Sequence, residues 1–198
     1  MFERLFQRKQ FQYKCHECGK THTGSPSFSY KYPEYYFDVP RNERETRVLV
    51  NADSCKISPN ADDASEDVIY CIRVILEIPI RNSAQPFTWG VWVSQSKNSF
   101  DQYVDTFDCD QSTQGSFGWL MVNMPFYSHP ETNEMPVHLE CDVEFGPMGQ
   151  RPKIRIWDCN HPLSIDQREG ISWRTATKIA NMANSQFLRT QTDKLLDA

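Results

Sequence analysis

The sequence predicts an α+β fold: an antiparallel β-sheet with one short helix and a C-terminal helix packed on it, preceded by an N-terminal zinc-knuckle-like segment. Apolar residues alternate with a period of two in several runs of residues 68–157, which is typical of strands. Residues 171–196 instead carry an apolar stripe with helical spacing. We expect a single domain over residues 1–198, with the knuckle segment in 11–60, the sheet in 68–157 and the helix in 171–196.

The central strands of the sheet are expected at residues 68–78 and 87–93. Both faces of the first run are largely apolar, which is typical of a strand in the middle of a sheet. The second run follows a short loop that contains Pro86, so we expect the two to pair antiparallel. Further strands are predicted at 118–124, 137–144 and 152–157.

Two helices complete the predicted fold. Ser96 is a suitable N-cap for a short helix whose apolar residues recur at i, i+3, i+4 and i+7, namely Phe100, Tyr103, Val104 and Phe107. Ser172 is the expected N-cap of the C-terminal helix. The apolar stripe of that helix comprises Ala176, Ile179, Ala180, Ala183 and Phe187.

Composition and charge exclude several classes of protein. Of the 198 residues, 39% are hydrophobic and 13% aromatic, which argues against disorder. The net charge of −5 excludes a uniformly basic nucleic-acid-binding surface, and no apolar run approaches the ~20 residues of a membrane span. The N-terminus lacks a secretory signal and the number of cysteines is odd, so we expect reduced thiols and a cytoplasmic location.

One constellation carries metal chemistry. Cys15 and Cys18 form a C-x-x-C pair followed by Gly19, and two thiolates on one side of such a turn are half of a tetrahedral zinc site. His22 is near enough in sequence to be a third ligand, and Cys55 is the natural fourth. Alternatively, His16 replaces His22 or Asp53 replaces a thiol. Zinc would be structural here, because residues 11–60 lack a strong apolar pattern.

Two interpretations without a metal compete with this one. A thioredoxin-like redox pair needs its first cysteine at a helix N-terminus, whereas the polar residues after Gly19 do not begin a helix. The thiols could also be free and merely structural.

Several motifs together resemble one bacterial family. They are CHECGKTHTG, DSC, FTWGVWVSQS, FGWL and RPKIRIWDCNHPLSIDQREGIS, and they span about residues 12–185. On these motifs the chain resembles the bacterial family known as domain of unknown function 2199. The resemblance implies a bacterial, cytoplasmic, single-domain protein and supports a grouping of Cys15, Cys18, His22 and Cys55. The family has no established activity to carry over, and its typical pattern lacks the acidic stretch 58–67.

The familiar catalytic motifs are missing: G-x-S-x-G, H-E-x-x-H, the P-loop and G-x-G-x-x-G are all absent. His161 is the most interesting lone histidine, with Asp158 and Asp166 near it in sequence. We expect it to fix the turn between the last strand and the last helix. An enzyme of unknown substrate that uses His161 with a nearby carboxylate is the alternative.

The remaining candidate residues suit protein binding. Tyr35 and Tyr36 belong to an aromatic cluster, and aromatic side chains dominate interface hot spots, although such a cluster can also simply cover the core. Glu140 and Asp142 lie on an acidic strand face that is either solvated or attracts a basic partner. The candidate binding residues are therefore Tyr35, Tyr36, Glu140, Asp142 and His161.

These observations favour a non-enzymatic, zinc-stabilised domain of the bacterial cytoplasm that binds another protein. Its small size, acidity and lack of a catalytic motif are compatible with an immunity protein that neutralises a toxin, by compositional association only. We expect no nucleic-acid partner and no membrane. A subunit with an oligomer interface is a third possibility.

Overall fold

The computed structural model describes residues 9–59, 67–128, 138–157 and 160–196, with side chains up to Ser185, so most of the acidic stretch 58–67 lies outside it. The strands are β1 (Gln12–Lys14), β2 (Thr21–Thr23), β3 (Ser27–Ser29), β4 (Val48–Val50), β5 (Ser54–Ile57), β6 (Ile69–Ile78), β7 (Phe87–Gln95), β8 (Gly115–Trp119), β9 (Glu140–Glu144) and β10 (Lys153–Ile156). The helices are α1 (Arg44–Arg47), α2 (Lys97–Asp105), α3 (Pro162–Glu169) and α4 (Trp173–Leu196).

The long strands β6 and β7 form the middle of the fold, as predicted. They pair antiparallel from Tyr70 opposite Gln95 to Ile78 opposite Phe87. Along one face of β6, Ile72, Val74 and Leu76 are completely buried. Complete burial of a large aliphatic side chain stabilises the folded state by roughly 1.5–3 kcal/mol. The strand pair β6–β7 therefore supplies much of the hydrophobic stabilisation.

The main sheet is mixed rather than purely antiparallel. Its strand order is β3-β7-β6-β10-β9-β8, and β5 pairs with both β4 and β6. Two strands share the edge of β6 that faces away from β7. Strand β5 pairs antiparallel with the first half of β6, and β10 pairs parallel with β6 at Ile75. The other parallel pair is β3 with β7. Every other named pair in this sheet is antiparallel.

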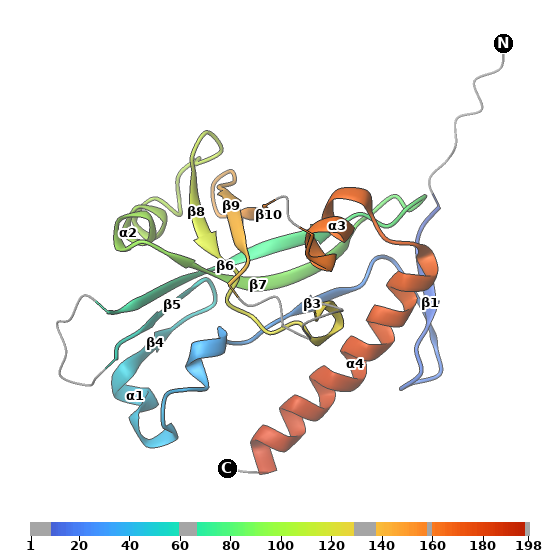
Figure 1. Cartoon of the computed structure of the whole chain (residues 1–198), viewed down its shortest axis with the longest axis horizontal. Coiled ribbons are helices and arrows are strands. Elements are labelled where there is room, and N and C mark those ends of the chain that lie inside the picture. Colours follow the sequence, from blue (N-terminus) through green and yellow to red (C-terminus); the bar gives the residue numbers. More distant parts are fainter. Residues whose placement is uncertain (1–8, 60–66, 129–137, 158–159, 197–198) are drawn as a thin grey trace.

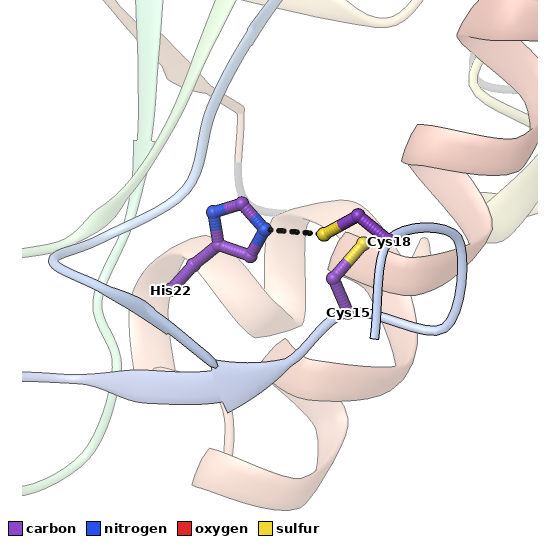
Figure 2. Close-up of side chains that lie close together, drawn as sticks. All are labelled: Cys15, Cys18 and His22. Atoms are coloured by element: carbon purple, nitrogen blue, oxygen red, sulfur yellow. Dashed lines mark hydrogen bonds between the residues drawn. The ribbon is translucent and has the colours of Figure 1, made fainter. Parts of the chain in front are cut away.

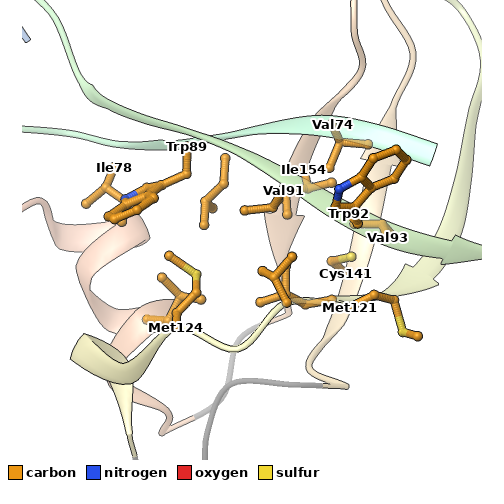
Figure 3. Packing of buried hydrophobic residues seen from close by; sticks show 14 of the residues in the cluster. Val74, Ile78, Trp89, Val91, Trp92, Val93, Met121, Met124, Cys141 and Ile154 are labelled. Carbon is orange, nitrogen blue, oxygen red and sulfur yellow. The ribbon is translucent and has the colours of Figure 1, made fainter. Parts of the chain in front are cut away.

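The sheet curls so that the chain beyond β8 returns to β7. Leu120 forms an antiparallel bridge with Val93, and the Met121 N–H donates to the Trp92 carbonyl at 2.8 Å. The curl encloses a core, and Figure 3 shows side chains from β6, β7, β9 and β10 meeting in it.

Both predicted helices begin next to the serine residues that were expected to cap them. The Ser96 hydroxyl accepts the Ser99 N–H at 3.1 Å at the start of α2, which contacts β6 and β7. The Ser172 hydroxyl accepts the Thr175 N–H at 3.0 Å at the start of α4. The α4 stripe is buried at Ala176, Ile179, Ala180 and Ala183, while the Phe187 side chain lies outside the described residues.

Two strands and one helix differ from the sequence prediction. The strand expected at 118–124 is instead β8, which ends at Trp119 because the next residues turn to β7. The strand expected at 137–144 begins only at Glu140, because His138 has a φ of 65°, which a strand cannot accommodate. Residue 137 lies outside the described residues. The sequence analysis also missed α3, which fills the predicted turn before α4.

The hairpin β1–β2 stands apart from the main sheet and lies along α4, as Figure 1 shows. Phe11, just before β1, is 1% exposed, and its ring lies 4.9 Å from that of Trp173 at the start of α4. The Trp173 indole N–H donates to the Gln12 carbonyl at 2.8 Å. Among the described residues, no helix is both long and apolar enough to cross a membrane.

A substitution at Gly118 tests how closely β8 crosses β7. A Cβ there would lie closer than 3.0 Å to the Ser94 carbonyl oxygen, which is backbone and cannot rotate away. We expect Gly118→Ala to lower the free energy of unfolding by about 1–3 kcal/mol, measured by urea denaturation. Gly90→Ala is the control, since its Cβ would chiefly meet the rotatable Ser29 side chain. Equal losses for the two variants would contradict the crossing.

Candidate metal centre

The turn between β1 and β2 has a geometry that turns two cysteines to one side. The Gly19 N–H donates to the Cys15 carbonyl at 3.0 Å, and the Cys15 N–H donates to the Lys20 carbonyl at 2.9 Å. Gly19 has a φ of 68°, which favours glycine at this position. The turn therefore needs the glycine that follows the C-x-x-C pair.

Three metal-ligand atoms meet at this turn. The Sγ atoms of Cys15 and Cys18 and a ring nitrogen of His22 lie within 4.8 Å of one another. Figure 2 shows the two thiols and the imidazole pointing toward one another, with Cys18 Sγ and His22 Nε2 3.3 Å apart. Tetrahedral zinc, with bonds of about 2.3 Å to sulfur and about 2.0 Å to nitrogen, needs its donors roughly 3.5–3.8 Å apart. The three side chains therefore fit a zinc ion with only small adjustments.

Strand register holds His22 in this position. It lies directly opposite Tyr13 in the hairpin, and the two rings stack at 5.3 Å with an interplanar angle of 20°. Tyr13 is 8% exposed. The imidazole is thus oriented by a buried neighbour.

Polar residues of α4 bind the knuckle from the other side. Asn181 accepts the His16 N–H at 2.8 Å and donates to the Lys14 carbonyl at 3.2 Å. The Asn184 Nδ2 lies 3.7 Å from Cys15 Sγ. The Ser185 hydroxyl donates to the Glu17 carboxylate at 2.8 Å. Sequence analysis missed this row, whose only signal is that two asparagines lie beside the apolar stripe.

The electrostatics at Cys15 favour a thiolate. Hydrogen bonds from the backbone amides of Cys18 and Glu17 hold the pKa of its thiol below the ordinary value. The deprotonated form is the one that binds metal. No helix begins at the pair, since Cys18 is followed by a turn and then by β2, so the geometry that a thioredoxin-like couple needs is missing here.

Cys55 does not join the group, which corrects the predicted fourth ligand. It lies on β5 opposite Cys71, and both side chains are completely buried in the sheet. Figure 1 shows β5 and the hairpin at opposite ends of the molecule. Burial raises the pKa of the Cys55 thiol to about 12, so it is a protonated packing residue. Asp53, the other alternative, instead pairs with Arg151 at 2.6 Å.

The predicted aromatic residues are partly buried. Tyr35 stacks on His138 at 5.6 Å, and Tyr36 stacks on Tyr32 at 3.8 Å with the Arg44 guanidinium over its ring. Both tyrosines pack against the core. Tyr35 also lines a groove of about 730 Å³, which places it beside a surface that the sequence analysis did not identify.

That surface is an exposed aromatic face on β8–β10, formed by Phe117, Trp119 and Trp157 with exposed fractions of 36%, 44% and 44%. The Phe117 ring lies 4.6 Å from that of Trp119 and 5.1 Å from that of Trp157. Phe117 and Trp119 also line the groove that contains Tyr35. Alternation indicates a strand here, but it cannot reveal which face stays uncovered.

The predicted acidic residues share this aromatic face. Glu140 is opposite Trp119, and Asp142 is opposite Phe117. The Asp142 carboxylate accepts the Trp157 indole N–H at 3.0 Å and pairs with Arg155 at 2.6 Å. Because Arg155 offsets the charge of Asp142, the face is less acidic than the sequence suggests.

His161 lies at the N-cap of α3. Its Nδ1 accepts the Leu163 N–H at 3.2 Å, and the side chain is 8% exposed. Asp166, a predicted partner, lies instead against the Tyr127 phenol, and burial raises the pKa of its carboxyl. Asp158 and Cys159 lie outside the described residues. His161 lines neither the groove that contains Tyr35 nor the groove between β10 and α3.

The cap predicts the behaviour of His161 variants. Removing it leaves the Leu163 N–H without this acceptor, so His161→Ala should lower the free energy of unfolding by about 1–2 kcal/mol. His161→Asn should lose less, because asparagine is among the best N-cap residues. Thermal melts of both variants against the parent measure the difference. Melting temperatures unchanged in both variants would contradict the structural role.

Comparison with known proteins gives one match. A family model described as an uncharacterized protein conserved in bacteria (DUF2199) matches residues 14–171. The match includes all three residues of the Cys–Cys–His group and ends before α4 begins. No curated protein and no solved structure matches the chain. The chain therefore belongs to this uncharacterised bacterial family.

Proposed function

We propose that this chain is a non-enzymatic, zinc-stabilised domain that binds another protein. The convergence of Cys15 Sγ, Cys18 Sγ and a His22 ring nitrogen within 4.8 Å carries the zinc part of the proposal. Two thiolates and an imidazole are a typical donor set for zinc. The thiolates offset the charge of the ion, and Asn184 offers Cys15 a neutral hydrogen-bond donor.

The ion would stabilise the attachment of the hairpin to α4. Each of the two strands has three residues, and the attachment to α4 consists of the packing of Phe11 on Trp173 and a few hydrogen bonds. Each such hydrogen bond contributes about 1 kcal/mol net, so a bound ion would add substantially to this attachment. A ligand that binds only the folded state, present at a free concentration 1,000 times its Kd, adds about 4 kcal/mol to the free energy of unfolding.

The aromatic face supports the protein-binding part of the proposal. Large exposed aromatic side chains in mutual contact are uncommon on a monomer and typical of interface hot spots. Glu140 beside Trp119 favours a partner with a basic residue next to an apolar anchor, whereas the charge of Asp142 is already offset by Arg155. That this partner is a toxin, and that the protein is cytoplasmic, stay predictions.

The enzyme alternative has less support. His161 uses Nδ1 to cap a helix, and Asp166 contacts Tyr127. A general base must reach a bound substrate, and His161 lines neither the groove that contains Tyr35 nor the groove between β10 and α3.

Metal content tests the zinc site. Protein purified without added metal should contain one zinc per chain by elemental analysis, and Cys15→Ser or Cys18→Ser should remove it. Cys55→Ser and Cys109→Ser are matched controls that should keep the ion, because neither thiol belongs to the group. Zinc near zero in the parent, or lost in Cys55→Ser, would overturn the proposed ligand set.

Affinity capture from the source bacterium tests the aromatic face. Trp119→Ala should weaken capture of a specific partner about 30-fold, because losing a hot-spot tryptophan costs about 2 kcal/mol. Leu49→Ala is the control, since Leu49 is 68% exposed on β4. Equal capture by the parent and Trp119→Ala would refute this surface. Sedimentation of the parent and Trp119→Ala identifies a second copy of the chain as the partner if only the parent is a dimer.

A further inference from the structure

The three donors of the Cys–Cys–His group are not equally covered. Cys15 is 3% exposed and faces Asn184 of α4, whereas Cys18 and His22 are exposed. An ion held by these atoms is covered on the side of Cys15 and accessible on the side of Cys18 and His22. A fourth donor can approach from solvent on that side.

The other donors predicted or adjacent in sequence do not complete the site. The Glu17 carboxylate, in the same turn, accepts the Ser185 hydroxyl. Asp53 pairs with Arg151 and Cys55 is buried on β5, far from the hairpin (Figure 1). In the part of the chain that the structure describes, the group consists of Cys15, Cys18 and His22. Three protein ligands with a fourth exchangeable position is the arrangement of open zinc sites, in contrast to closed structural ones.

The donor set indicates which ligand would enter. Two thiolates and an imidazole make a soft environment, in which a further sulfur donor competes better than a carboxylate. The Asn184 amide, whose Nδ2 lies 3.7 Å from Cys15 Sγ, is a neutral donor on the covered side of the group. A compact thiolate supplies such a sulfur donor.

We propose that the ion bound by Cys15, Cys18 and His22 takes a thiolate from another molecule at its fourth coordination position, on the exposed side of Cys18 and His22. This inference rests on the zinc part of the proposed function. The incoming thiol loses its proton to solvent, and its sulfur binds the ion in exchange for solvent. No electron is transferred, and no oxidant is needed.

Cobalt substitution tests this inference on the full chain. Co²⁺-loaded protein, kept reduced with a phosphine, is titrated with 2-mercaptoethanol while its visible and near-ultraviolet absorption is recorded. We expect a saturable increase in the sulfur-to-cobalt absorption that ends at one thiol per ion. Acetate at the same concentrations should leave the spectrum unchanged, and so should thiol added to Cys15→Ser.

The outcomes separate the two proposals. Failure of the parent to bind Co²⁺ or Zn²⁺ overturns the metal site itself. A bound ion whose spectrum does not respond to thiol overturns this inference alone. A response that appears only in Cys159→Ser would mean that the chain supplies its own fourth thiolate, which also overturns the inference; Cys159 lies outside the described residues. An equal response to acetate contradicts the preference for sulfur.

Discussion

Nine residue pairs join β6 to β7, and most of the fold is built on that antiparallel pair. Their buried side chains, including Trp89 and Trp92, are completely excluded from water. The Arg73 guanidinium, opposite Trp92 in register, covers its ring at 4.5 Å, so even the polar position of β6 helps to bury the pair. The two outer edges of the pair then receive β3, β5 and β10, and the return of the chain after β8 closes the core.

The hairpin β1–β2 is outside this arrangement, so its attachment depends on its own contacts and on any ion that the Cys–Cys–His group binds. Among the strands that the structure describes, it has no hydrogen-bonded partner in the main sheet. It depends on α4, through Trp173 and the polar row that begins at Asn181. Bringing Cys15, Cys18 and His22 to one point requires the Gly19 turn, the hairpin register and the α4 contacts together. A bound ion would in turn stabilise all three, and metal binding would then be thermodynamically coupled to the docking of α4.

Local signals predicted much of this structure from sequence. The apolar faces of β6, the Ser96 and Ser172 caps and the knuckle turn each depend on residues close in sequence. The errors involve long-range contacts. Cys55 looked like a ligand because spacing cannot reveal that its strand pairs with β6 at the far end of the molecule. In the same way, no local pattern indicates that Asn184 meets Cys15, or that Trp119 and Trp157 gather on an uncovered face.

The composition of the metal site is the central claim, and X-ray absorption at the zinc edge measures it most directly. For protein purified without thiols, the account predicts two sulfur neighbours at about 2.3 Å and an imidazole nitrogen at about 2.0 Å. The spectrum of the Cys18→Ser variant should show less sulfur scattering than that of the parent, whereas the spectrum of Cys55→Ser should match that of the parent. A parent spectrum with three or more sulfur neighbours, or with none, would contradict the account.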